Sequence, residues 1–178
     1  MENTVLSSNK LVIKWSLFYI IVSIILTYVY QLINIDPNSG IRYISLLPYI
    51  GFLFLCQKEY KDQLGGYLTF GQGFLAGFKY TVITAILAAL FIYIYWTILS
   101  PQAFQQIIDS SKAKMEAKGN LTEDQINMAL SFTTVGFTTI ILVISSLIMG
   151  TIISLIGAAI FKKQPPMFTA VSDDEVVE

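Results

Sequence analysis

Long apolar blocks alternate with short polar segments along the whole chain. The blocks lie at about residues 11–33, 43–58, 74–99 and 132–161. A helix that crosses the hydrocarbon core of a bilayer needs about 20 apolar residues. The first, third and fourth blocks meet this length, and the second falls short of it unless it extends to Tyr60. The pattern predicts an all-α membrane protein with four transmembrane helices.

The first block is predicted to be an uncleaved span. Its only charge is Lys14, at its start, and aromatic residues flank both ends: Trp15, Tyr19, Tyr28 and Tyr30. Aromatic side chains gather at the two membrane interfaces. The block is longer than the roughly 7–15 apolar residues of a signal peptide, and no small-residue cleavage site follows it.

The second block leaves two readings open, because it is short and contains Pro48 and Gly51. If it crosses, six lysines lie on the side of the termini (Lys10, Lys14, Lys58, Lys61, Lys162 and Lys163) and four basic residues lie opposite (Arg42, Lys112, Lys114 and Lys118). If it is re-entrant, the split is five against five. Cytoplasmic loops carry the excess of Lys and Arg. The count favours four spans with both termini in the cytoplasm.

Helix-start signals divide the second half of the chain. Thr69 and Gln72 have the spacing of a capping box, which predicts the start of the third helix. Ser100-Pro101 predicts a fresh N-cap with proline in the first turn. Gly119-Asn120 predicts a break, and Thr122 to Gln125 is a second capping box, from which the fourth helix is expected to run on into its span.

The outer segment, residues 101–130, is predicted to be an extracytoplasmic helical hairpin between helices 3 and 4. One face of its first helix is mostly apolar: Phe104, Ile107, Ile108, Ser111 and Met115. The opposite face is polar: Gln105, Asp109, Lys112 and Glu116. Such spacing is typical of an amphipathic helix. Residues 1–163 thus form one four-span domain, and residues 164–178, with two prolines and four acidic residues, form a disordered acidic cytoplasmic tail.

Composition removes many kinds of chemistry. The chain has no histidine and one cysteine, Cys56, so His-based catalysis, His metal sites and an internal disulfide are excluded. No Asp or Glu falls inside the apolar blocks, which argues against a carboxylate-based proton relay. A net charge of −1 gives no field for nucleic acid. We expect no catalytic residue, no metal and no cofactor.

Small residues recur at helical spacing in two predicted spans. Gly73 and Gly77 form a G-x-x-x-G pattern, and the last span has a row of four: Ser146, Gly150, Ser154 and Ala158. Small residues let membrane helices approach closely. We interpret both sets as helix-packing residues within one subunit, with a contact between two copies as the alternative.

Four polar residues are candidates for the lining of a path: Lys79, Ser131, Thr134 and Thr138. A lysine inside a span can face a substrate cavity. It can also reach the headgroups with its long side chain, and hydroxyls can bond to carbonyls of their own helix. We favour the structural interpretation of all four.

One stretch of the chain resembles a known family. It reads Gly66-Tyr67-Leu68-Thr69-Phe70-Gly71-Gln72-Gly73-Phe74-x-x-Gly77, and is supported by Tyr93 to Pro101, the polar helical insert, and Ser154-Leu155-Ile156 to Lys162-Lys163. These segments are similar to the bacterial membrane proteins grouped as domain of unknown function 4199. The resemblance implies four helices in a bacterial inner membrane, and it carries over no activity and no functional residue.

The functional expectation is a non-enzymatic integral membrane protein, a scaffold or accessory subunit that meets partners through its outer segment. Its partners would be membrane lipids and either a second copy or another membrane protein. The alternative is a small transporter or pore-forming subunit lined by Lys79 and the stripe of Ser131, Thr134 and Thr138. A membrane enzyme would need a reactive cluster at one interface, for which Glu59, Lys61 and Asp62 are the candidates.

Overall fold

The computed structural model describes residues 8–33 and 40–164. The elements, in chain order, are α1 (Ser8–Leu32), the 3₁₀ helix η1 (Gly40–Ser45), α2 (Leu46–Gln63), α3 (Phe70–Ile94), the π-helical turn η2 (Tyr95–Leu99), α4 (Pro101–Lys118), α5 (Glu123–Ser131) and α6 (Val135–Phe161). The predicted all-α fold is confirmed for the described residues. The tail predicted for residues 164–178 lies outside them, apart from Gln164.

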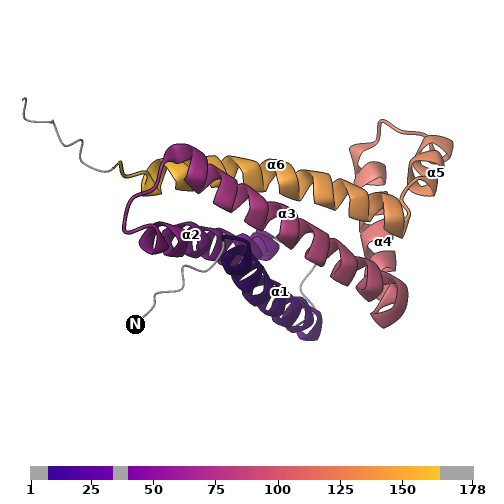
Figure 1. The fold of residues 1–178 in the computed structure, drawn as a ribbon. Helices are drawn as coiled ribbons and strands as arrows, with labels where there is room; N and C mark the ends of the chain where they lie inside the picture. Colours follow the sequence, from indigo (N-terminus) through magenta and orange to yellow (C-terminus); the bar gives the residue numbers. More distant parts are fainter. Residues whose placement is uncertain (1–7, 34–39, 165–178) are drawn as a thin grey trace, which may run out of the picture.

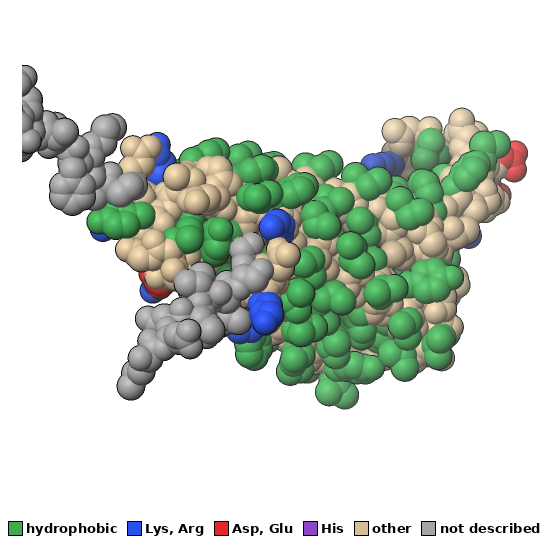
Figure 2. Space-filling model, viewed as in Figure 1, with side chains coloured by type: hydrophobic (Ala, Val, Ile, Leu, Met, Phe, Trp, Pro, Cys, Tyr) green, Lys and Arg blue, Asp and Glu red, His purple; other side chains and the backbone are tan. Residues whose placement is uncertain are grey.

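The antiparallel helices α3 and α6 form the central pair of the fold (Figure 1). Helices α1 and α2 pack on α3, α2 also contacts α6, and α4 and α5 lie at the far end of the pair. Among the residues that the structure describes, three helical stretches are long and apolar enough to cross a membrane: Asn9–Leu32, Phe70–Leu99 and Val135–Phe161. Their outward faces carry large apolar side chains such as Ile21, Ile86 and Ile148, each more than half exposed, and Figure 2 shows this surface in green. Apolar surface of this extent is typical of a membrane protein.

The structure distinguishes the second predicted span from the other three. Helix α2 is not among the stretches that qualify as spans, and its last turns are charged. Tyr49 in its first turn bonds to Thr81, near the middle of Phe70–Leu99, and Gln57 bonds to Gly73 near the start of α3. Helix α2 therefore covers about half the length of α3. Within the described residues, three helices are candidate membrane spans, α2 is shorter and more charged, and a fourth span is not clearly shown.

The local start and stop signals are found where they were predicted, with one exception. Thr69 with Gln72, and Thr122 with Gln125, form complete capping boxes, and Gly119 ends α4 with φ of 66°. Ser100 precedes Pro101 as predicted, but its side chain makes no capping hydrogen bond. The chain reaches it through the η2 turn, in which the backbone amide of Ser100 donates to the carbonyl of Tyr95 at 2.7 Å. A wide turn rather than a side-chain cap ends the third span.

The last predicted helix is two helices. Helix α5 ends at Ser131, and α6 begins at Val135, after Thr134 accepts a hydrogen bond from the amide of Phe137. This cap competes with continuation of α5, because the side chain of Thr134 satisfies an amide at the start of α6. The break allows α5 to fold back onto α4, so that the two helices form a hairpin at one end of the bundle (Figure 1).

Candidate functional site

The seam between α3 and α6 is built from small residues. A Cβ added to Gly73 would lie 3.3 Å from the Cα of Ala158, and one added to Gly77 would lie 2.8 Å from Ser154 Oγ. A Cβ on Gly150 would lie 2.6 Å from Thr81 Oγ1. Five of the six residues proposed for helix packing therefore lie together on this seam. The sixth, Ser146, lies one turn further along α6 and lines a cavity described below.

A buried glutamine joins three helices at this seam. Gln57 of α2 is fully buried, and its Nε2 donates to the carbonyl of Gly73 at 2.9 Å and to that of Ser154 at 3.0 Å. An added Cβ on Gly77 would lie 2.6 Å from the same nitrogen. Glycines on both long helices thus make room for the amide. Gln57 was not predicted from the sequence, because its bonds to Gly73 and Ser154 depend on which helices are neighbours.

Hydroxyl pairs connect the other helices to α3. Tyr49 of α2 donates to Thr81 Oγ1 at 3.1 Å, and Thr84 donates to Ser16 Oγ of α1 at 3.1 Å. Tyr49, Thr81, Thr84 and Ser16 are all buried. In a low-dielectric interior such pairs keep polar groups satisfied and fix which helices are neighbours.

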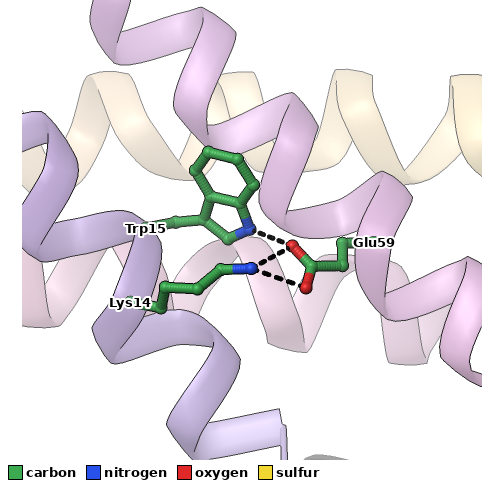
Figure 3. A network of polar contacts seen from close by, with 3 residues as sticks. All are labelled: Lys14, Trp15 and Glu59. Atoms are coloured by element: carbon green, nitrogen blue, oxygen red, sulfur yellow. Dashed lines mark hydrogen bonds and ion pairs between the residues drawn. The ribbon is translucent and has the colours of Figure 1, made fainter.

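An ion pair joins α1 to α2 at the end of the bundle where α1 begins. Lys14 Nζ lies 2.6 Å from both carboxylate oxygens of Glu59, and Trp15 Nε1 donates to the same carboxylate at 2.7 Å (Figure 3). The two charged side chains are 39% and 29% exposed, so solvent still reaches the pair. Glu59 lies on α2, where it anchors α1. From the sequence, Glu59 had been considered only as a candidate for a reactive cluster with Lys61 and Asp62.

A cavity of about 120 Å³ lies beside the first turn of α2, among α1, α3 and α6. Its walls include Tyr19, Leu46, Thr84, Ala88, Ser146 and Met149. The cavity brings together residues from α1, α2, α3 and α6. From the sequence, Tyr19 had been assigned to a membrane interface and Ser146 to helix packing, and the other lining residues were not singled out.

Comparison with known families assigns the chain to one of them. A model of a family of proteins of unknown function, DUF4199, matches residues 14–163. The chain belongs to this family. The match confirms the resemblance drawn from the sequence, and it includes the seam, Gln57, the cavity and the hairpin. No curated protein and no solved structure matches the chain.

The polar lining suggested for a path is not brought together in this DUF4199 protein. Lys79 lies in the first half of α3, where its amine donates to Asn9 Oδ1 at 3.1 Å. Since Gly73 faces Ala158 and Thr81 faces Gly150, Thr138 lies level with the end of α3. With a rise of 1.5 Å per residue, Lys79 and Thr138 are separated by about 21 Å along the helices.

The remaining two members of that stripe have local partners. Ser131 donates to the carbonyl of Met128, and Thr134 caps α6. Lys79, Ser131 and Thr134 thus bond within the fold, and the stripe does not share a gap with Lys79.

The residues considered for an enzyme site, Glu59, Lys61 and Asp62, all lie in the last turns of α2, where Glu59 is paired with Lys14. The cysteine Cys56 is fully buried in the core. Among the residues that the structure describes in this DUF4199 protein, no group of three or more His, Cys, Asp or Glu side chains could hold a metal ion.

Proposed function

We propose that the protein is a non-enzymatic component of a bacterial inner membrane, a scaffold or accessory subunit that meets its partners through the α4–α5 hairpin. The observation that carries this proposal is the construction of the hairpin. Phe104 is 9% exposed and packs on Trp96 with ring centroids 5.3 Å apart, and Ile126 of α5 is 4% exposed. The hairpin is thus a folded unit, anchored on η2, whose polar face remains free for contact.

The polar chemistry within the bundle supports the same proposal. Gln57, the Tyr49–Thr81 pair and the Lys14–Glu59 pair each join two or more helices. These contacts hold the helices in place. The exposed polar side chains of α4, such as Gln105 and Asp109, bond to each other and leave the rest of their surface accessible.

Photo-cross-linking in cells tests this proposal. A photoreactive amino acid is placed at Gln105 or Asp109 on the exposed face of α4, and at Ile86 on the lipid-facing side of α3 as the matched control. We expect a discrete heavier adduct from the two hairpin positions and none from Ile86. An adduct of twice the mass of the chain would identify the partner as a second copy. Equal results at the hairpin and control positions would contradict the proposal.

A further inference from the structure

The cavity beside α2 lies half-way along the long helices. Thr84 and Ala85 in its wall are in the centre of the Phe70–Leu99 stretch. Helix α2 begins at this level, so its first turn, with Leu46, forms the boundary of the cavity. If the three candidate spans cross a bilayer, the cavity is at the bilayer centre.

The cavity opens sideways, onto the apolar surface of the bundle. Thr84 and Ala85 in its floor are 2% and 5% exposed. Leu46 and Met149 at its rim are 37% and 48% exposed. A molecule that enters between these two side chains comes from the lipid and not from either aqueous face.

Four of the hydroxyl groups around the cavity are used by the protein itself. Tyr49 donates to Thr81, which donates to the carbonyl of Gly77 at 3.1 Å. Thr84 donates to Ser16, and Ser146 donates to the carbonyl of its own helix at Val143. The surface that faces the cavity is therefore mostly carbon. Water needs two to four polar partners to occupy a cavity, so these walls favour an apolar guest.

We propose that this cavity binds the end of a lipid hydrocarbon chain. Chains of both leaflets end near the middle of a core about 30 Å thick, which is the depth of the opening. An apolar cavity of about 150 Å³ accommodates benzene, so one of 120 Å³ accommodates the last few carbons of a chain. Filling it restores the dispersion contacts that an empty space forfeits. This inference depends on the spans crossing the bilayer and is independent of the role of the hairpin.

Photolabelling from the lipid tests the inference. The full chain is reconstituted in vesicles of phosphatidylethanolamine and phosphatidylglycerol that contain a small fraction of a phospholipid with a diazirine on the last carbon of one chain. A second probe carries the diazirine next to the headgroup. After illumination, mass spectrometry compares labelling of the cavity residues Leu46, Ala88 and Met149 with that of Ile86 and Ile148, which face outward at a similar depth.

We expect the chain-end probe to label the cavity residues more strongly than the outward-facing ones, and the headgroup probe to show no such preference. Ala88→Phe fills the cavity and should abolish the preference, whereas Ile86→Phe on the exposed face of the same helix should retain it. Ser146→Leu closes the cavity from α6 and replaces Ala88→Phe if that variant does not fold. Equal labelling of both sets of residues, or a preference that survives in a folded cavity-filling variant, would overturn the inference.

Discussion

At the scale of single residues, the fold depends on polar side chains that reach between helices. Gln57 is the clearest case, because one amide bonds to carbonyls of both α3 and α6 while its Oε1 has no protein partner. Lipid offers helices no hydrophobic force for association, so packing and hydrogen bonds between helices decide which helices meet. A residue of this kind specifies the position of α2 against the long pair.

Replacement of Gln57 by alanine should destabilise the bundle. The change removes two hydrogen bonds between helices and leaves a void beside Gly77 and Gly157. We expect a loss of about 1–3 kcal/mol in the free energy of unfolding in mild detergent. Gln106→Ala, on the exposed face of α4, is the control and should have no measurable effect. Equal stability of the two variants would show that Gln57 does not hold the helices together.

A pair of glycine substitutions on α6 tests the seam. An added methyl group on Gly150 would meet Tyr49 and Thr81, whereas one on Gly136 meets nothing within 4 Å. We expect Gly150→Ala to cost about 1–3 kcal/mol through overpacking. Gly136→Ala should be neutral or should stabilise the protein slightly, because alanine has the higher helix propensity. Thermal unfolding followed by circular dichroism measures both, and a neutral Gly150→Ala would contradict the close approach of α6 to α2 and α3.

At the scale of elements, the hairpin is held to the bundle by few contacts. The main buried apolar contact is that of Phe104 in α4 with Trp96 in η2. Phe104→Ala should loosen α4 and α5 without unfolding the long helices. We expect faster hydrogen exchange across residues 101–131 and unchanged exchange in α3 and α6, with Met128→Ala, at a position 66% exposed, as the control. A uniform increase over the whole chain would show that the hairpin and the bundle unfold as one unit.

Sequence signals predicted where the elements begin and end better than they predicted which elements pack together. The boxes at Thr69 and Thr122 and the stop at Gly119 involve residues within four positions of one another, so the local sequence contains them. The Lys14–Glu59 pair joins residues 45 positions apart, and the bond from Gln57 to Ser154 spans 97. Such contacts follow from the packing order of the helices, which the apolar pattern leaves open.

The position of α2 along α3 and the break before α6 escaped prediction for a similar reason. An apolar run indicates that a segment is buried or faces lipid. It does not indicate how far the segment extends along the neighbouring helices. Tyr49 is fixed at mid-length by Thr81 of another helix. At the break, Thr134 was read as part of a polar stripe, because its capping role appears only once α6 begins at Val135.

At the scale of the whole molecule, basic residues gather at one end of the bundle. Lys14 is held by Glu59, Lys58 and Lys61 lie in the last turns of α2, and the backbone of Lys163 pairs with that of Leu68 just before α3. The three lysines of α4 lie at the other end, with four acidic residues on the same hairpin. Because α2 leads the chain back to the end where α1 starts, its short length does not alter the sidedness expected from the lysine count.

We therefore predict that the lysine-rich end is cytoplasmic and that the hairpin lies outside. A matched pair of cysteines tests this without removing any lysine: Asp62→Cys at the end of α2 and Asp109→Cys on α4, both at exposed positions. A maleimide that cannot cross membranes should label position 109 in intact cells, and position 62 only after permeabilisation, because positive charge is retained on the cytoplasmic side. The unaltered chain supplies the background, which should be low because Cys56 is fully buried. Labelling of position 62 but not 109 in intact cells would show that the protein has the opposite orientation in the membrane. The hairpin would then face cytoplasmic partners, and the excess of lysine would have to be explained by contacts such as that between Lys14 and Glu59 rather than by membrane orientation.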